Sequence, residues 1–359
     1  KVAQVICSVH LTDGTPFAGD PRNNLKRVIK EMNDAGFSAF NIGPEPEFFL
    51  FETDENGNTT TKVNDQENYF DLEPADKGED CRRDIVLALE SMGYNVEAAH
   101  HEVAPGQHEV DFKYSDALEA ADNIQIFKLV VKTIAKKYGF HATFMPKPIF
   151  GDNGSGMHVH SSLWSGDKPL FYDENGYEGL SDMARWYIGG VLRHAPALLA
   201  FTNPSVNSFH RLVPGFEAPV NLVYSQRNRS ACIRIPITGS NPKAKRIEFR
   251  CPDPSSNPYL AFAAILLAGL DGVQNRIEPP APIDKDLYEL PPEEHAEVPT
   301  VPASLSAVLE ALETDHEFLL AGDVFTPDLI ATWVDLKRTE IQAIAVRPHP
   351  HEFELYYAL

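Results

Sequence analysis

The sequence has few cysteines, no long apolar run and a shortage of basic residues. Its four cysteines form no C-x-x-C pair, which argues against a disulfide framework and against a thiolate zinc site. The longest apolar stretch, Tyr259 to Leu270, is shorter than the ~18–20 residues that span a bilayer. Lys and Arg number 31 against 52 Asp and Glu, and a net charge of −21 would repel nucleic acid and anionic membranes. We therefore expect a reduced, cytoplasmic protein that binds neither nucleic acid nor a membrane.

What the chain does contain is enough apolar material for a large core. Hydrophobic residues make up 43% of the 359 positions and aromatic residues 10%, which excludes disorder. The first helix is predicted from Asp20 as N-cap and Pro21 as first residue to a stop at Gly36. Periodicity predicts further helices over 80–92, 117–138, 181–201, 257–273, 304–313 and 327–344, and strands over 40–51, 95–101, 108–114, 141–145, 156–164, 231–236 and 246–251. The class is α+β with a largely antiparallel sheet, and the proline-rich stretch 278–303 is predicted to be a surface loop.

Two pairs of acids lie in segments that otherwise look buried. In GPEPEFFLF (43–51) a period of two places Glu45 and Glu47 on one face, although an edge strand with two exposed acids is the alternative. In HHEVAPGQHE (100–109) the spacing is wrong for a zinc-protease helix, and Pro105 and Gly106 prevent a continuous helix. A hairpin instead brings Glu102 and Glu109 together, with two exposed hairpin acids as the alternative.

Two later strands carry histidines and an acid between arginines. His158 and His160 alternate onto one face, and the glycine-rich loop before them lacks the Gly-Lys-Ser/Thr ending of a P-loop. In RIEFR (246–250) Glu248 lies between two arginines on one face, which by itself is also the pattern of a structural salt-bridge ladder.

Considered together, these residues predict a metal-dependent phosphoryl-transfer site. Carboxylates that converge in a cleft repel one another unless cations neutralise them, and an oxygen-rich set with one imidazole suits Mg²⁺ or Mn²⁺. The candidate ligands are Glu45, Glu47, Glu102, Glu109, His158 and Glu248, which suffice for two ions. A basic group could clamp a phosphoryl group in transfer, with a surface patch as the alternative; its members are Arg211, Arg227, Arg229, Arg234, Lys243, Arg246 and Arg250.

Six motifs, in the same order along the whole chain, resemble type I bacterial glutamine synthetase. They are GPEPEF (43–48), HEVAPGQHE (101–109), NGSGMHVH (153–160), RLVPGFEAP (211–219), RNRS (227–230) and RIEFR (246–250). The resemblance implies the catalytic-domain fold of that family over residues 1–359, a curved antiparallel sheet with metal ligands on its concave face and helices outside. It implies ATP-dependent ligation of L-glutamate and ammonia through γ-glutamyl phosphate.

The resemblance also assigns roles to individual residues. Glu47, Glu102 and Glu109 would hold one Mg²⁺ or Mn²⁺ ion, and Glu45, His158 and Glu248 a second. Asn153, Gly154 and Arg211 would bind the substrate amino acid, and Glu217 would close the glutamate entrance and accept a proton from ammonium. The remaining assignments are phosphoryl stabilisation by Arg229, Arg234 and Arg250, and nucleotide contacts by Glu97, His160, Ser162, Arg234 and Lys243.

The resemblance raises three expectations about assembly and regulation. The family has an N-terminal β-grasp domain that lends an aspartate to the neighbouring subunit's site; we expect this domain to be absent from this chain and its ligase activity to be impaired or absent. Family members form two stacked hexameric rings, and the apolar end 351–359 fits a tail that docks in the opposite ring. Tyr288 lies in a segment resembling a loop that some branches adenylylate.

Three other functions remain open on the sequence. A γ-glutamyl-polyamine or alkylamine ligase would use the same metal and phosphate machinery. A guanidino-phosphotransferase also combines a magnesium nucleotide with arginines, but does not need six metal ligands. A non-catalytic regulatory fragment could keep the fold without the reaction.

Overall fold

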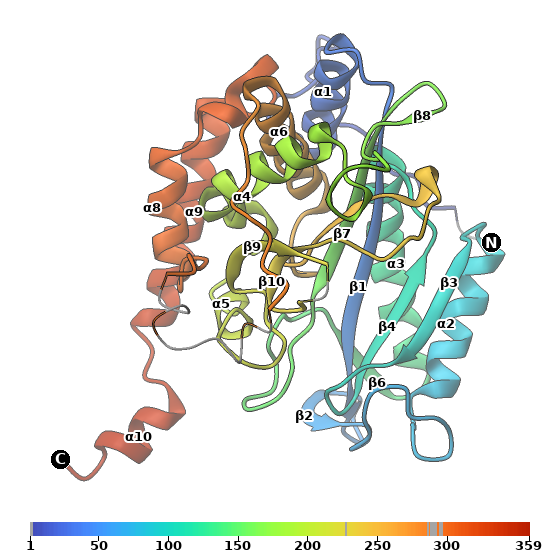
Figure 1. The fold of residues 1–359 in the computed structure, drawn as a ribbon. Helices are drawn as coiled ribbons and strands as arrows, with labels where there is room; N and C mark the ends of the chain where they lie inside the picture. Colours follow the sequence, from blue (N-terminus) through green and yellow to red (C-terminus); the bar gives the residue numbers. More distant parts are fainter. Residues whose placement is uncertain (1–2, 227, 286, 288–292, 294–296) are drawn as a thin grey trace.

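The described part of the chain folds around one sheet. The structure is a computed structural model that describes residues 3–226, 228–285, 287, 293 and 297–359 (Figure 1). The strand order is β3-β4-β1-β7-β11-β10-β9; β2, β5 and β6 also pair with β1, and β8 pairs with β7. The strands are β1 (Ala39–Thr53), β2 (Thr59–Val63), β3 (Val96–His101), β4 (Gln107–Phe112), β5 (Ser115–Asp116), β6 (Phe140–Thr143), β7 (Met157–Ser165), β8 (Lys168–Pro169), β9 (Asn221–Ser225), β10 (Ala231–Arg234) and β11 (Ile247–Phe249).

The sheet is mixed and open. All pairings between the described strands are antiparallel except that of β9 with β10, which is parallel. The prediction of a largely antiparallel sheet is therefore confirmed with one exception. The sequence analysis did not predict β2, β9 or the two-residue strands β5 and β8.

The register around β1 brings the predicted ligands side by side. On one edge of β1, Glu47 pairs with Glu109 of β4, and on the other edge Glu45 pairs with His158 of β7. Glu248 of β11 pairs with His160 of β7. Because side chains of neighbouring strands at the same register project to the same face, the acids of β1, β4 and β11 and the histidines of β7 meet above one part of the sheet.

Helices surround the sheet (Figure 1). Helices α2 and α3 pack beside β3, β4 and β1, while α4 and α6 cross closely on the other side of the molecule. That crossing needs glycine, because a Cβ on Gly190 would lie 2.7 Å from the Cα of Gly272. The helices are α1 (Pro21–Asp34), α2 (Glu79–Ser91), α3 (Ala117–Lys137), α4 (Asp182–Thr202), α5 (Ser208–Arg211), α6 (Pro258–Asn275), α8 (Leu305–Thr314), α9 (Pro327–Ala345) and α10 (Pro350–Tyr356), with 3-10 turns η1 (Tyr177–Gly179), η2 (Pro242–Ala244) and η4 (Glu317–Asp323).

Most helix limits follow the capping signals in the sequence. The Asp20 side chain accepts a hydrogen bond from the main-chain N–H of Asn23 and begins α1, as predicted. Asn257 caps α6 in the same way, and Pro258 is the first residue of that helix. Helix α6 is buried along nearly its whole length, so the apolar run from Tyr259 to Leu270 is a core helix. Within the described residues, no helix is long and apolar enough to cross a membrane.

The C-terminal helix α10 projects away from the rest of the chain (Figure 1). The side chains of Phe353, Tyr357 and Leu359 are exposed there. An apolar end of this kind is typical of an interface, so docking against another subunit stays a prediction.

A buried histidine joins three helical segments far from the sheet. In α4, His194 Nδ1 lies 2.8 Å from Asp315 Oδ2 and His194 Nε2 lies 2.9 Å from Asp271 Oδ2. Both ring nitrogens can donate at once only in the protonated ring. Burial disfavours that charge, but the two carboxylates outweigh burial and raise the pKa of His194. The protonated ring therefore connects α4 to α6 and to the end of α8.

Replacement of His194 by glutamine is expected to lower the free energy of unfolding by ~2 kcal/mol at pH 6, because two charge-assisted hydrogen bonds are lost. A raised pKa in the folded state means that the contribution is complete below the ordinary value of 6.5 and disappears as the pH rises through the folded value. Urea denaturation between pH 6 and pH 9 measures the difference. The control is the His141→Gln change in the exposed part of β6, and an equal loss at every pH would contradict the assignment.

Candidate active site

One polar pocket is lined by residues from stretches that lie far apart in the sequence. Its lining includes five of the six predicted metal ligands, and the carboxylate of the sixth, Glu248, lies 3.6 Å from His158 Nδ1. The predicted residues in the lining are Glu45, Glu47, Glu102, Glu109, Asn153, Gly154, His158, Arg211, Glu217, Arg229, Arg234 and Arg250. The convergence predicted from the sequence is therefore present, and the alternatives of exposed edge-strand or hairpin acids are excluded.

Glu47 is held by two donors on one oxygen. Gln107 Nε2 donates to Glu47 Oε2 at 2.8 Å, and the main-chain N–H of Gly156 donates to the same oxygen at 2.9 Å. Burial and the nearby charge of Glu102 nevertheless raise the pKa of Glu47 well above its ordinary value. A buried carboxylate of this kind needs either a proton or a cation.

Glu109 is also a buried carboxylate with acidic neighbours. His100 Nε2 is 3.1 Å from Glu109 Oε2, and His100 Nδ1 is 3.6 Å from Glu102 Oε1, so one imidazole lies between two predicted ligands. Burial raises the pKa of Glu109 well above its ordinary value, and the charges of Asp111 and Glu47 raise it further. These acids have too few basic neighbours to be ionised together without added cations.

Glu45, His158 and Glu248 form a second group. His158 Nδ1 lies 3.4 Å from Glu45 Oε2 and 3.6 Å from Glu248 Oε1. Although burial opposes ionisation, the two nearby histidines, His160 foremost, lower the pKa of Glu45 well below its ordinary value. Burial and the charge of Arg250 lower the pKa of His158 to about 4, which leaves its ring neutral and able to coordinate a cation.

His160 is less suited to be a metal ligand than His158. Its Nδ1 accepts a hydrogen bond from Arg246 Nε at 3.2 Å, and its Nε2 lies 2.7 Å from Glu45 Oε1. In this tautomer Nε2 carries the proton and donates to the carboxylate, so neither ring nitrogen is free.

Arginines border the acidic groups. Arg234 Nε and Arg250 Nη1 each form an ion pair with Glu248, which is fully buried. Burial disfavours its charge, but Arg250 and then the two histidines lower the pKa of Glu248 to about 2. Arg211 is also buried, and its guanidinium donates to the carbonyls of Arg250, Cys251 and Pro252. Arg227, which the sequence placed in this basic group, lies outside the described residues.

A second pocket adjoins the first. Glu45 and Asp111 line both, so the two spaces meet above β1 and β4. Four of the five residues predicted to contact a nucleotide line this second pocket: Glu97, His160, Ser162 and Lys243. Arg234, the fifth, lines the first pocket.

Two loops border the acidic pocket. Asn153 and Gly154 belong to the loop that leads into β7, and a Cβ on Gly154 would lie only 2.4 Å from the carbonyl oxygen of Pro146, so no larger residue fits. The flap loop (212–218) also lines the pocket and presents Glu217, whose carboxylate lies 3.2 Å from Arg229 Nη1.

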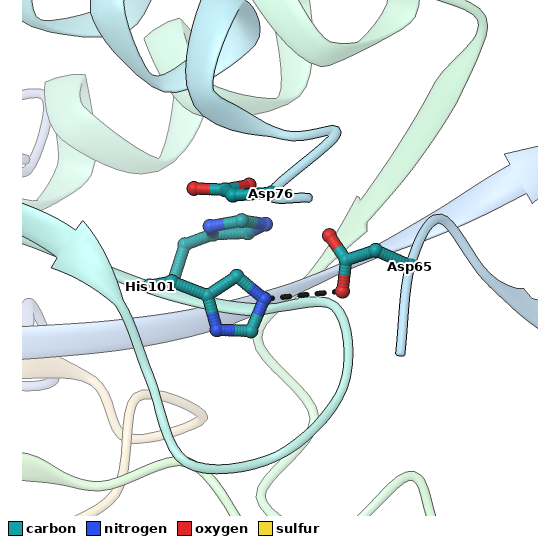
Figure 2. Close-up of side chains that lie close together, drawn as sticks. Asp65, Asp76 and His101 are labelled. Atoms are coloured by element: carbon teal, nitrogen blue, oxygen red, sulfur yellow. Dashed lines mark hydrogen bonds and ion pairs between the residues drawn. The ribbon is translucent and has the colours of Figure 1, made fainter. Parts of the chain in front are cut away.

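A second layer of polar residues supports the β3–β4 hairpin from behind. His101 Nε2 lies 3.1 Å from Asp65 Oδ1, as Figure 2 shows, and Asp65 also accepts from the main-chain N–H of Gly106. Beside them Arg82 pairs with Asp76 at 2.8 Å and donates to His108 Nδ1 at 2.8 Å. The set of Asp65, Asp76, His101 and His108 resembles a metal site. Here Arg82 already supplies the positive charge that balances the two aspartates.

The sequence analysis did not find several residues of these pockets. Tyr69, His100, Gln107, Asp111 and Phe216 line the first pocket without having been predicted. Asp111 could have been found, because it follows Glu109 by two residues on β4 and must share its face. Burial and the charge of Glu45 raise the pKa of Asp111 to about 8. Tyr69 comes from an irregular segment whose position no periodicity reports.

Comparison with known proteins gives one consistent result. Residues 18–356 match the model of the family described as glutamine synthetase, catalytic domain. A glutamine synthetase of Streptomyces coelicolor is 60% identical over 96% of this chain and 79% of its own length. Among solved structures, Plasmodium falciparum glutamine synthetase superposes with a TM-score of 0.89 at 33% identity, covering 98% of this chain and 81% of that one. A GmaS/ADP complex gives a TM-score of 0.87, also at 33% identity, over 98% and 80% of the two chains.

Proposed function

Because the chain belongs to the glutamine synthetase family, we propose that its two adjoining pockets bind glutamate and ATP for one shared reaction. The chain is an enzyme, an ATP-dependent ligase that joins L-glutamate and ammonia to form L-glutamine. The observation that supports the site assignment best is the meeting of Glu45, Glu47, Glu102, Glu109 and Glu248 with His158 beside three arginines.

The donor set fits divalent cations. Burial and neighbouring acids raise the pKa values of Glu47 and Glu109. A bound cation would stabilise the ionised form of these carboxylates. Glu47, Glu102 and Glu109 would hold one ion, and Glu45, His158 and Glu248 another, with Mg²⁺ or Mn²⁺ favoured by the oxygen-rich set. Bound there, such ions neutralise phosphate oxygens and hold them in place.

Different residues of the chain support different steps of the reaction. A carboxylate is a poor acyl donor, and transfer of the ATP γ-phosphoryl group to the glutamate side chain supplies a leaving group. Arg229, Arg234 and Arg250 surround the position where that negative charge moves, and they stabilise it. Ammonia then attacks the acyl carbon and phosphate leaves. Glu217 at the flap is the carboxylate placed to accept the proton from ammonium.

Substrate and nucleotide are held by separate elements. Asn153 and Gly154 bind the amino acid, and Arg211 shapes this side of the pocket through the three carbonyls it supports. Glu97, His160, Ser162 and Lys243 contact the nucleotide in the second pocket. Residues 1–359 then act as one catalytic domain, and the enzyme works in the cytoplasm as a homo-oligomer of two hexameric rings.

Binding of Mn²⁺ to the group of Glu47, Glu102 and Glu109 is expected to release about one proton at pH 7, and the affinity of this site should fall up to about tenfold per unit of decreasing pH. The group of Glu45, His158 and Glu248 should release none, because the pKa values of all three are lowered. The raised pKa values of Glu47 and Glu109 mean that these carboxyls hold protons which the ion must displace. Titration calorimetry in two buffers of different ionisation enthalpy counts the protons. Glu47→Gln, which has no carboxyl proton to lose, should release fewer, and a pH-independent affinity of the wild-type chain would contradict the assignment.

The choice of acceptor amine is tested by product analysis. Incubation with ATP, Mg²⁺ and glutamate should yield glutamine when ammonium is supplied and little product with methylamine or putrescine. The likeness to a GmaS/ADP complex makes this comparison necessary, since the phosphate machinery does not depend on the amine. A preference for either amine over ammonium would overturn the proposed acceptor. ADP release without any amide product would overturn the proposal that this chain alone completes the ligation.

A further inference from the structure

The flap turn that carries Glu217 has an unfavourable backbone. The main-chain N–H of Ala218 donates to the carbonyl of Gly215 at 3.0 Å, which closes a tight turn. The two central residues, Phe216 and Glu217, have φ angles of 52° and 55°. Both lie in the left-handed region, where turns normally use glycine or asparagine. Such a turn persists only where contacts from outside hold it.

Two contacts from other segments reach this turn. Glu217 forms its ion pair with Arg229, and both side chains are about half exposed. In the second contact the ammonium nitrogen of Lys147 lies 4.3 Å from the centroid of the Phe216 ring. A cation over an aromatic face is attracted by the ring, and more strongly where water is partly excluded.

Lys147 is itself firmly placed. Its main-chain N–H donates to Asn207 Oδ1 at 2.7 Å, and its carbonyl accepts from Asn207 Nδ2 at 3.0 Å. Asn207 immediately precedes α5, and α5 leads directly into the flap. The position of Lys147 is therefore tied to the base of the flap through one amide side chain.

The same ammonium group also reaches the substrate loop. Lys147 Nζ donates to the carbonyl oxygen of Asp152, next to Asn153 and Gly154. The start and end of this loop are joined by the bond from Ser155 N to Pro146 O at 2.8 Å. One side chain thus contacts both the loop proposed to bind glutamate and the flap proposed to cover it.

We propose that Lys147 is a positioning residue that holds the flap turn at Phe216 closed against the substrate loop, so that ammonia and not water attacks the acyl phosphate. The inference rests on the proposed function. When the flap opens, water oxygen bonds to the acyl carbon, the bond from that carbon to the phosphate oxygen breaks, and glutamate and phosphate form. ATP is then consumed without formation of glutamine.

The test is the number of phosphates released per glutamine formed. In the wild-type chain the ratio should be close to one. For Lys147→Met at low ammonium it should rise about two- to fivefold, the factor expected for one lost cation–π contact, and KM for glutamate should rise by a similar factor. The ratio should fall toward one as ammonium increases, because ammonia competes with water. Lys147→Arg keeps a cation over the ring and should restore coupling.

A second pair of variants tests the ring contact alone. Phe216→Leu removes the aromatic face and leaves the Lys147 contacts to Asn207 and Asp152 intact, so it should also uncouple, whereas Phe216→Tyr should not. The control is Lys132→Met, because Lys132 lies 5.7 Å from the centroid of the Phe144 ring, is exposed and lines neither pocket.

The outcomes separate this inference from the proposed function. If wild-type chain makes glutamine but Lys147→Met and Phe216→Leu stay coupled, or lose only kcat with coupling unchanged, Lys147 does not position the flap. If the wild-type chain makes no glutamine from ammonium, the proposed function fails, and this inference fails with it.

Discussion

Replacement of Glu248 by alanine is expected to remove one divalent ion per chain and to lower kcat by ~10³-fold or more, because a ligand and a charge partner disappear together. Glu248 is fully buried, approaches His158 at 3.6 Å and pairs with both Arg234 and Arg250. Without it the two guanidinium groups lose their common anchor at the position where negative charge moves during transfer.

The ion count is measured by Mn²⁺ electron paramagnetic resonance or anomalous scattering, separately from turnover. Glu248→Gln keeps the shape of the side chain but not its charge, and it should also lose the ion. The control is Glu313→Ala, which removes a surface carboxylate that pairs with Arg338 on the outside of the molecule. Full ion binding by both Glu248 variants would remove this residue from the ligand set and would favour the salt-bridge ladder considered at the sequence level.

Replacement of Arg250 by lysine is expected to lower kcat by ~10²–10³-fold with a much smaller change in KM for glutamate, because the lost interaction strengthens only as the phosphoryl group moves. Arg250 is buried and lines the pocket, its Nε donates to the carbonyl of Arg229 at 3.0 Å, and its Nη1 pairs with Glu248. Lysine keeps the positive charge that Glu248 requires, but its compact ammonium group lacks the planar, spread donors of a guanidinium, so it cannot reach the carbonyl, the carboxylate and a phosphate oxygen in the same geometry.

The kinetic split distinguishes a catalytic arginine from a structural one. Steady-state kinetics of Arg250→Lys should be compared with Arg338→Lys, a surface arginine in α9 that pairs only with Glu313 among its carboxylate neighbours in the described chain. Thermal denaturation of both variants shows whether the fold is retained. A fall in melting temperature with unchanged kcat would assign Arg250 to the support of Glu248 and not to phosphoryl transfer.

The starts of helices and the faces of strands could be predicted well, because residues close together in the sequence determine them. The N-caps Asp20 and Asn257 and the prolines after them define the starts of α1 and α6 to the residue. The period of two correctly placed Glu45 and Glu47 on one face of β1. The parallel pairing of β9 with β10 was not predictable, because strand partners depend on contacts between distant segments and not on the pattern within one strand.

The amino-acid sequence by itself determined which residues are candidates for the chemistry: the acids, the histidine and the arginines all stand in recognisable short motifs. Only the tertiary structure decided how they act on one another. The register that places Glu47 beside Glu109 and Glu45 beside His158 buries like charges together, and burial and neighbouring charges shift their pKa values in opposite directions. Asp111 and Lys147, which stand outside the motifs, come into contact with the pocket residues in the same way, because electrostatic and packing energies depend on distance in space and not on separation along the chain.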